Sequence, residues 1–496
     1  MPHVAVIGSG FSSLAAACTI AKEGLNVTVF EKNSGPGGRA RNFETGGFRF
    51  DMGPSWYWMP DVFEKFFKNF GKTTGDYYEL IRLDPSYRIY FGKNDLLDIP
   101  AGVDALTAMF EDLEPGSGKF LQQFLEEARF KYEAATNHLL YKNRLSLPDI
   151  LHPFIRGRIL KLHLLQSVSG YIKKFFREPR LVKLLEFPVL FLGATPEKTP
   201  ALYTLMNYAD MSLGTWYPQG GMFKVVEGMV SLAESFGVKF SFNSTVEAIA
   251  IHNGRTTGVQ ANGLFYPADY VLSGADYQHV EQNLLPENFR NYSTKYWNSR
   301  VLAPSCLVFY VGLNKKLTSI LHHTLFFDED FAQHAKEIYE EPRWPTSPQF
   351  YISCASRTDP DAAMTGCENL MILIPVAAGL KDEEITREKY FNLIIDRFEN
   401  ITGESVRNHI VFKRSYAHND FVADYNAFKG NAYGLANTLL QTANFKPSIS
   451  NGKVKNLFYA GQLTVPGPGV PPSIISGQIA AGELIKKYQK SIKEFV

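Results

Sequence analysis

The sequence predicts an α/β protein in which a parallel-sheet domain is interrupted by a second sheet and a helical region. A strand–turn–helix–strand pattern fills the first 31 residues, which is typical of a βαβ unit. Beyond residue 300, separated β-rich runs predict a second, mixed or largely antiparallel sheet. The stretch from about Asp104 to Tyr208 is predicted to be mostly helical, and it includes a helix from Lys119 to Tyr141, where apolar residues recur at helical spacing.

The composition is that of a globular protein. The chain has 496 residues, enough for two or three domains of roughly 150 residues each. Hydrophobic residues make up 45% and charged residues 20%, which argues against a disordered chain. The net charge is +1 and no Lys/Arg run resembles a nucleic-acid tail, so we expect no nucleic-acid partner.

The four cysteines match neither a zinc-ligand spacing nor a disulfide framework; they are Cys18, Cys306, Cys354 and Cys367. We expect them to be small buried side chains. No metal site is predicted. Cysteines of this kind indicate a reducing, cytoplasmic compartment.

No transmembrane helix is predicted. The longest stretch without a charged residue runs from 456 to 482, but it contains four prolines, Pro466, Pro468, Pro471 and Pro472. Such a density of proline does not suit a lipid-exposed helix. The apolar N-terminus lacks the basic region of a signal peptide, and its glycines fall where a strand–turn–helix needs them.

The N-terminal pattern predicts a Rossmann-type dinucleotide site. Residues 4–7 form a buried strand, residues 11–23 a helix and residues 25–30 a second strand. Gly8 permits the tight turn, and Gly10 lets the backbone approach a pyrophosphate at the helix N-terminus. Glu31, about 20 residues on, would accept from a ribose hydroxyl. Ser13 replaces the third glycine and is small enough for helix and strand to pack.

The next motif indicates FAD rather than NAD. Gly37-Gly38-Arg39 follows Glu31, and the glycine pair allows a second close approach of the backbone while Arg39 can neutralise phosphate charge. Asp51-Met52-Gly53-Pro54 follows a hairpin-like segment, residues 43–50. Together these motifs resemble the FAD-binding fingerprint shared by amine oxidases, carotenoid desaturases and Rab escort-type proteins.

The order of the predicted elements indicates a discontinuous nucleotide domain, because the first βαβ unit needs more strands to complete its sheet. A helix (223–236) and strands (239–242, 245–252, 258–261 and 270–273) lie in mid-chain, and a last strand (457–461) precedes a Pro/Gly loop and a helix from about Ser473. The β-rich runs at 302–313, 349–355 and 370–377 belong to the second sheet. We therefore predict an FAD-binding domain (1–75, 215–295, 448–496), a substrate domain (76–103, 296–447) and a helical, membrane-associating region (104–214).

Several separated blocks resemble bacterial phytoene-desaturase-type carotenoid desaturases, and together they span nearly the whole chain. Residues 217–222 resemble the family's aromatic-Pro-x-Gly-Gly-Met turn, and Thr358-Asp359-Pro360 resembles its Thr-Asp-Pro element. The segment from Gly430 to Pro447 follows its Gly-Leu…Gln…Arg-Pro pattern, with Lys446 at the arginine position.

The C-terminal block resembles the flavin-binding motif of that family most specifically. It runs from Tyr459 to Gly477, with Gln462 and Ser473 departing from the usual small residues. Pro471 and Pro472 are suited to opening a helix, whose N-terminal end would favour an anionic reduced flavin. Motif and resemblance together imply these FAD-binding residues: Gly8, Gly10, Phe11, Ser12, Ser13, Glu31, Lys32, Gly37, Gly38, Arg39, Gly53, Pro54, Ser55, Val246, Gly461, Gly469, Val470, Pro471 and Ile474.

A basic and apolar segment from Leu151 to Leu185 predicts contact with a membrane surface of anionic lipid. One acid, Glu178, stands against eight basic residues: Arg156, Arg158, Lys161, Lys173, Lys174, Arg177, Arg180 and Lys183. Interleaved with them are Leu160, Leu162, Leu164, Leu165, Tyr171, Phe175 and Phe176. Such a mixture is typical of an interfacial helix, although a solvated helical face over a core has a similar composition.

The resemblance implies a cytoplasmic enzyme, peripheral on the inner face of the cell membrane, that desaturates a membrane-dissolved carotenoid. A hydride would pass from an allylic carbon to flavin N5 and a proton would leave the adjacent carbon. The substrate would be phytoene-like or of the 1′-hydroxycarotenoid or γ-carotene type, with oxygen or a quinone as the terminal acceptor. Asp210, Glu227 and His418 are considered as proton acceptors, but the sequence assigns none of them.

Two alternatives share the fold. A flavin amine oxidase would need an aromatic cage, and often a lysine-bound water, near the flavin ring. The sequence offers no clear candidate residues for either feature. A non-enzymatic prenyl-protein escort need not keep flavin contacts, whereas both the N-terminal and the C-terminal blocks are present.

Overall fold

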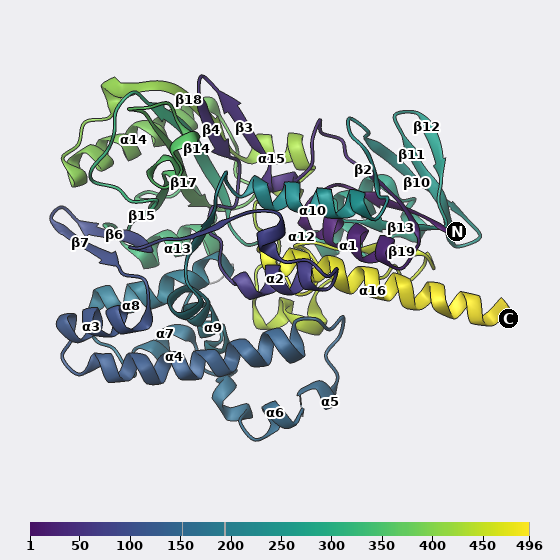
Figure 1. Cartoon of the computed structure of the whole chain (residues 1–496), viewed down its shortest axis with the longest axis horizontal. Coiled ribbons are helices and arrows are strands. Elements are labelled where there is room, and N and C mark those ends of the chain that lie inside the picture. The colour runs from purple at the N-terminus through teal and green to yellow at the C-terminus, as the bar shows by residue number, and fades with distance from the viewer. Residues whose placement is uncertain (151, 193–194, 496) are drawn as a thin grey trace.

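The computed structural model describes residues 1–150, 152–192 and 195–495 (Figure 1). In this part of the chain, one parallel sheet has five strands in the order β19-β13-β1-β2-β9. They are β1 (His3–Ile7), β2 (Asn26–Phe30), β9 (Lys239–Ser241), β13 (Tyr270–Ser273) and β19 (Leu457–Tyr459). The sheet therefore joins the beginning, the middle and the end of the chain.

Three helices pack together beside this sheet: α1 (Phe11–Lys22), α10 (Phe223–Ser235) and α16 (Val470–Phe495). Helix α16 begins at Val470, three residues before the predicted start at Ser473. Pro471 and Pro472 therefore lie inside its first turn, where the missing N–H of proline costs no hydrogen bond. Figure 1 shows α16 running from the centre of the molecule to its far end.

The second sheet is mixed. Among the residues that the structure describes it has seven strands, in the order β18-β14-β17-β16-β15-β6-β7. Among the described strands of this sheet, only β15 and β6 pair in parallel. The strands are β6 (Tyr87–Gly92), β7 (Asp95–Ile99), β14 (Ser305–Leu313), β15 (His323–Phe326), β16 (Phe350–Ser353), β17 (Glu368–Val376) and β18 (Ile410–Tyr416). The three predicted β-rich runs are β14, β16 and β17.

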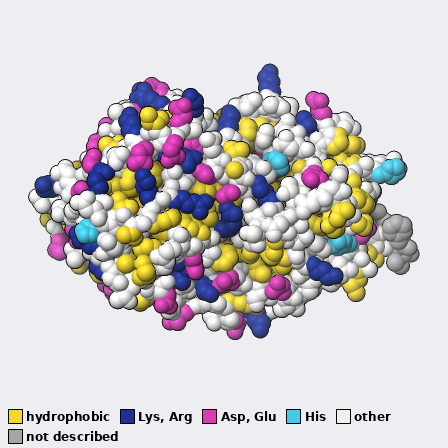
Figure 2. Space-filling view, turned by 90° about the horizontal axis from the view of Figure 1, so that it is seen from above, with side chains coloured by type: hydrophobic (Ala, Val, Ile, Leu, Met, Phe, Trp, Pro, Cys, Tyr) yellow, Lys and Arg dark blue, Asp and Glu magenta, His cyan; other side chains and the backbone are white. Residues whose placement is uncertain are grey.

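A core cluster joins this sheet to α14 (Glu384–Thr402) through Ile394, Ile395 and Phe398. The helices α13 (Phe331–Tyr339) and α15 (His418–Tyr425) flank the sheet. Figure 2 shows the molecule from above, with the second sheet and its helices at the left of the picture. Acidic and basic side chains are interspersed there. That face carries no broad field of one sign.

The region after β7 is built from helices, as its apolar periodicity predicts. It contains α3 (Val103–Leu113), α4 (Ser117–Ala134), α5 (Leu147–Ile150), α6 (Pro153–Arg156), α7 (Val168–Ile172), α8 (Pro179–Glu186) and α9 (Leu205–Tyr208). The helix predicted to reach Tyr141 ends as α-helix at Ala134 and continues as a π-turn to Leu139. Within the described residues, no helix is long and apolar enough to cross a bilayer.

The remaining elements connect these layers. Small sheets are formed by β3 (Asn42–Thr45) with β4 (Phe48–Asp51), by β5 (Leu80–Arg82) with β8 (Trp216–Pro218), and by β10 (Val246–His252), β11 (Arg255–Ala261) and β12 (Leu264–Pro267). The short helices are α2 (Pro60–Lys68), α11 (Tyr277–His279) and α12 (Thr294–Asn298). All four cysteines are buried and free, which confirms the prediction that they act as small core side chains.

The first turn of α1 is packed so tightly that two neighbouring positions have no room for a side chain. A Cβ on Gly274 would lie 2.2 Å from Ser13 Oγ, and a Cβ on Gly477 of α16 would lie 2.1 Å from the Ser12 carbonyl oxygen. Ser13 is thus accommodated in place of a glycine because its neighbour after β13 is itself a glycine. The same contact presses α16 onto α1.

The packing predicts a stability difference between two glycines of α16. Gly477→Ala should destabilise the fold by about 1–3 kcal/mol, because an added methyl group in a filled core forces the neighbouring backbone to shift. Gly482→Ala is the matched control, since no heavy atom lies within 4 Å of a Cβ there and alanine favours an exposed helix by about 1 kcal/mol. Thermal unfolding followed by circular dichroism measures both. Equal melting temperatures would contradict the packing argument.

Candidate functional site

A cavity of about 390 Å³ lies at the carboxyl ends of β1, β2 and β13. This is the edge at which open α/β sheets bind ligands. Its wall contains these predicted cofactor residues: Gly8, Gly10, Phe11, Ser12, Glu31, Lys32, Gly37, Gly38, Arg39, Gly53, Pro54, Ser55, Val246, Gly461, Gly469, Val470 and Pro471. The side chains of Ser13 and Ile474 pack in the core instead, fully buried.

The turn before α1 leaves space for a ligand. Gly10 is the N-cap of α1, and a Cβ built there meets no heavy atom within 4 Å. The first backbone N–H groups of a helix have no partner within the helix, and the helix dipole favours negative charge at this end. The open space at Gly10 therefore suits a phosphate group.

Glu31 is fixed at the end of β2 by four hydrogen bonds. Its Oε2 accepts from the backbone N–H of Ser9 (2.9 Å) and from the Ser9 hydroxyl (2.7 Å). Its Oε1 accepts from the backbone N–H (2.8 Å) and the side-chain amide (2.9 Å) of Asn33. A ribose hydroxyl would share or replace one of these bonds, since each carboxylate oxygen has two lone pairs. The ribose contact of Glu31 stays a prediction.

Arg39 presents a poorly paired guanidinium to the cavity. One Nη donates to the Asn431 carbonyl (3.1 Å), whereas Nε is buried without a hydrogen-bond partner. Burial lowers the pKa of Arg39 below its ordinary value, partly offset by the nearby Asp276 carboxylate. A buried cation with an unused donor is costly unless an anion pairs with it. The site thus fits a ligand that carries phosphate.

The other end of the cavity is apolar and aromatic. Its wall is formed by Trp56, Trp58, Met59, Pro188, Met206, Val308, Tyr351, Leu373 and Tyr433. Among the residues that the structure describes, the carboxylates of the cavity wall are Glu31, Asp276 and Asp424. Glu31 directly follows β2, and Asp276 lies shortly after β13. Asp424 lies beside them, because its carbonyl accepts from the Asn33 side chain (3.3 Å). Charge is thus confined to the nucleotide end.

A smaller apolar chamber of about 70 Å³ adjoins this end. Tyr351, Leu373 and Tyr433 line both spaces. The chamber is otherwise enclosed by side chains such as Leu325 and Phe350 of the second sheet, Phe327 directly after β15, and Ile338 of α13. The two spaces together suit a long apolar ligand.

The three residues considered as proton acceptors lie outside the described cavity wall. Asp210 is buried, where it accepts from the Tyr87 hydroxyl (2.6 Å) and the Thr215 hydroxyl (3.1 Å), and burial raises its pKa to about 6. Glu227 forms an exposed ion pair with Lys224 (2.7 Å). The His418 ring bonds to the Ala377 carbonyl (2.8 Å). Their contacts are those of structural residues.

Two of the family-like blocks meet in a buried junction away from the cavity. Asp359 Oδ2 accepts from Arg49 (2.5 Å), the Tyr217 hydroxyl (3.0 Å) and the Gly220 N–H (3.0 Å). Asp51 accepts from the N–H groups of Met222 (2.8 Å) and Phe223 (3.2 Å), and so caps α10. Residues 217–222 and 358–360 therefore tie the second sheet to α10.

Lys446, which stands at the family's arginine position, lies behind the Pro/Gly loop. It is 6% exposed, and its Nζ has no hydrogen-bond partner. Burial lowers its pKa to about 7. A Cβ on Gly467 would lie 3.2 Å from this Nζ, so the Lys446 side chain packs directly against the loop.

Comparison with known proteins identifies the family. The sequence matches the family described as flavin containing amine oxidoreductase over residues 11–485. The chain belongs to this family. Its cofactor is FAD, which fits the open glycine turn and the buried Arg39 guanidinium, whose Nε has no hydrogen-bond partner.

Relatives of this flavoprotein carry desaturase names. A carotenoid 3,4-desaturase from Haloarcula japonica is 39% identical, with 97% of this chain and 98% of the relative covered. A zeta-carotene-forming phytoene desaturase from Myxococcus xanthus is 32% identical, with 97% and 94% covered. A 4,4'-diapophytoene desaturase from Staphylococcus haemolyticus is 32% identical, with 97% and 98% covered. The resemblance to carotenoid desaturases is confirmed.

Solved structures share the fold. An oxidoreductase from Methanosarcina mazei has a TM-score of 0.62 at 16% identity, covering 98% of this chain and 100% of its own. A redesigned putrescine oxidase has a TM-score of 0.62 at 14% identity, covering 98% and 99%. At these identities the likeness shows the fold alone.

Sequence reasoning missed the apolar end of the cavity. Trp56 and Trp58 directly follow the predicted Gly53-Pro54-Ser55 contact, so their place in the chain could have indicated a role beside the flavin. Tyr351 and Tyr433 have no such signal. They reach the cavity through the pairing of strands in the second sheet and through a loop after α15.

The geometry predicts that Arg39 contributes to FAD affinity while its neighbour Arg41 does not. Arg39→Met should raise the Kd for FAD about 10- to 100-fold, since a hydrogen bond to a charged group contributes about 1.5–3 kcal/mol. Arg41→Met is the control, because Arg41 stacks over the same Tyr425 ring (5.2 Å for both) but pairs with Asp424 (2.5 Å). Flavin fluorescence during titration of apoprotein gives both constants. A similar loss in both variants would contradict the assignment.

Proposed function

We propose that the protein is an FAD-dependent carotenoid desaturase that introduces C=C bonds into a membrane-dissolved carotenoid. The single observation that supports this most is the two-ended cavity. Its nucleotide end carries the glycines and charged groups for FAD, and its other end is aromatic and without carboxylates among the described residues. A long, uncharged polyene matches that end, whereas an amine cation would want a carboxylate or a built aromatic cage.

The Rossmann-type pattern assigns roles to the nucleotide end. The first turn of α1, from Gly10 to Ser12, would hold the pyrophosphate, and Arg39 would neutralise it. Gly461, Gly469 and Val470 would lie along the flat ring. FAD, when bound, supplies a two-electron oxidant that accepts a hydride at N5.

The apolar end would align the substrate and exclude water. Trp56, Met206 and Leu373 offer flat or flexible apolar surfaces to a polyene. Alignment of the reacting C–H bond beside the flavin contributes to the rate by removing the cost of orientation. The 39% identity to a carotenoid 3,4-desaturase, against 32% to a phytoene desaturase, favours a 3,4-desaturation.

The same division supports the proposed domains. The FAD-binding domain is assigned to 1–75, 215–295 and 448–496, which contain the five parallel strands. The substrate domain is assigned to 76–103 and 296–447, which contain the seven-stranded sheet. Oxygen or a quinone as terminal acceptor remains a prediction.

We place the membrane contact on a narrower surface than the basic segment as a whole. Leu162, Tyr171 and Phe176 are buried in the core, so they cannot face lipid. Leu160 and Leu165, by contrast, are 87% and 101% exposed, and the exposed Arg158 and Lys161 belong to the same short segment of the chain. These four residues form the proposed membrane patch, which combines apolar insertion with attraction to anionic lipid.

The activity is tested directly with FAD-loaded protein in liposomes that contain phytoene, γ-carotene or a 1′-hydroxycarotenoid. We expect one of them to give a product whose absorption moves to longer wavelength, because desaturation lengthens the conjugated system. Amines tested in parallel should release no peroxide. Peroxide from amines with unchanged carotenoids would instead support an amine oxidase.

The membrane patch predicts a selective loss of lipid binding. Leu160→Ser/Leu165→Ser should reduce flotation with liposomes that contain phosphatidylglycerol, because each leucine contributes apolar burial. Leu264→Ser/Phe265→Ser is the matched control, since these side chains are 63% and 56% exposed on β12, distant from α6 in Figure 1. Equal flotation of the first variant and the wild type would exclude this patch as the contact.

A further inference from the structure

A hydrogen-bonded string of three side chains ends at the apolar wall of the cavity. The Tyr351 hydroxyl lies 2.6 Å from His323 Nδ1 and 2.9 Å from Ser55 Oγ. Tyr351 and Ser55 both line the cavity, and Tyr351 also lines the adjoining chamber. The phenol is therefore a polar group set at the junction of two apolar spaces.

The string is built by strand register. In the antiparallel β15–β16 pair, His323 is opposite Ser353, two residues from Tyr351. Diagonal neighbours of this kind project from the same face of a sheet, which brings the imidazole to the phenol. Ser55 arrives from the segment after β4, next to the predicted flavin contacts Gly53 and Pro54.

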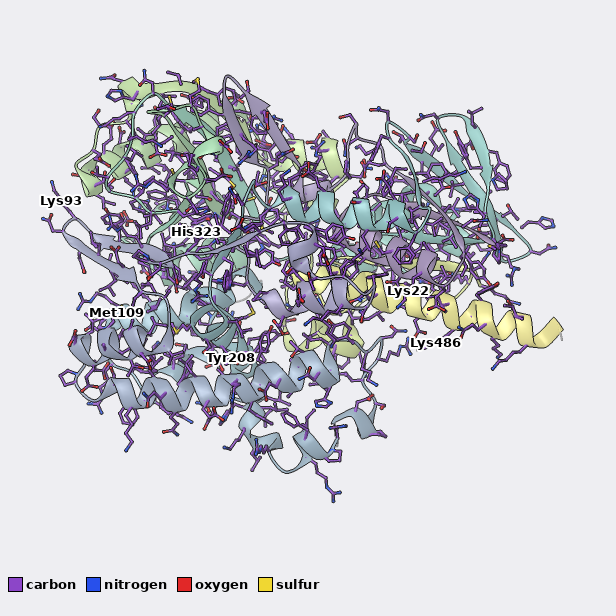
Figure 3. All side chains as sticks on the ribbon, viewed as in Figure 1. Lys22, Lys93, Met109, Tyr208, His323 and Lys486 are labelled. Carbon is purple, nitrogen blue, oxygen red and sulfur yellow. The ribbon has the colours of Figure 1, made fainter. Side chains whose placement is uncertain are left out.

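His323 can take up a proton at Nδ1, the nitrogen that faces the phenol. The ring is fully buried, and its Nε2, which carries the N–H in the tautomer that accepts at Nδ1, has no hydrogen-bond partner. Its ring stacks on Trp56 with centroids 4.0 Å apart and planes at 14°. Figure 3 labels His323 in the lower part of the second sheet, where β15 lies between β16 and β6. A transient imidazolium there would be stabilised by the indole face.

We propose that the Tyr351 hydroxyl accepts the proton that leaves the carotenoid, while His323 takes up the phenol's own proton at Nδ1. This rests on the proposed desaturase function. One C–H bond of the substrate breaks, and its hydrogen leaves with the bonding electron pair as a hydride to FAD. The adjacent C–H bond breaks and leaves its electrons in the new C=C bond. Its proton passes to the Tyr351 oxygen, so the phenol stays neutral and His323 becomes imidazolium.

The surroundings keep both groups ready for this transfer. Burial holds the pKa of His323 well below its ordinary value, so the imidazole is neutral before the reaction. Burial also raises the pKa of Tyr351, so the phenol is neutral. The titratable neighbour that faces His323 is His322, at 4.5 Å between ring centroids, and its Nδ1 bonds to the Thr358 hydroxyl (2.8 Å).

Tyr351→Phe keeps the ring and removes the proton acceptor. We expect the rate of flavin reduction by carotenoid, followed by anaerobic rapid mixing, to fall about 100-fold or more, as is typical for loss of a general base. The FAD content should not change. Tyr87→Phe is the matched control, because it also removes a buried phenol, one bonded to Asp210 and packed on Trp56, but outside the described cavity wall.

His323→Gln is the second variant and retains Tyr351. It should show a comparable loss and a smaller solvent deuterium isotope effect on flavin reduction than the wild type. Nitrogen-15 NMR of histidine-labelled holoenzyme gives a readout apart from activity, since Tyr351→Phe should shift the Nδ1 resonance of His323 and Tyr87→Phe should not.

Three outcomes separate the hypotheses. If Tyr351→Phe and His323→Gln both reduce flavin within threefold of the wild-type rate, the relay is overturned. If Tyr351→Phe fails to fold, His323→Gln decides the test: slower flavin reduction with a smaller solvent isotope effect than in the wild type supports the relay. If the wild type desaturates no carotenoid, the proposed function fails, and the NMR shift then reports only a structural hydrogen bond.

Discussion

The first turn of α1 is the constraint on which the rest of the site depends. The backbone after β13 and the helix α16 both press against it at distances that exclude a side chain at Gly274 and Gly477. This contact brings together chain segments that are more than 200 residues apart. Because the two segments must lie flush with the turn, the space that remains at Gly10 is the cavity in which a dinucleotide fits.

Local patterns in the sequence predict the parts of the fold that are themselves local. The β1-α1-β2 unit, the β3–β4 hairpin and the strands β10 and β13 lie within a few residues of their predicted bounds, because periodicity and turn residues act over short distances. Helix α16 begins at Val470 rather than at the predicted Ser473, because the two prolines suited to opening the helix already form part of its first turn. The parallel β15–β6 pair has no local signature at all, because its paired residues, such as Thr324 and Arg88, are 236 positions apart in the sequence.

The same distinction holds for the site. Glycines and charged residues at the nucleotide end belong to compact motifs, and nearly all of those predicted residues line the cavity. The residues considered for proton transfer were chosen by side-chain type alone, and Asp210 and His418 prove to have structural partners. The Tyr351–His323 contact depends on the β15–β16 register, which periodicity cannot specify when strands are buried on both faces.

The arrangement of charge and apolar surface also explains how a substrate insoluble in water could reach the flavin. Pro188 and Met206, which line the apolar end, belong to the same helical region that presents Leu160 and Leu165 to solvent. A membrane bound by those leucines would lie against the region that walls the cavity. The substrate would then exchange one apolar environment for another, so its transfer would gain or lose little hydrophobic free energy. Binding would depend on shape, and the flat walls offered by Trp56 and Trp58 favour a rigid, planar polyene over a flexible saturated chain.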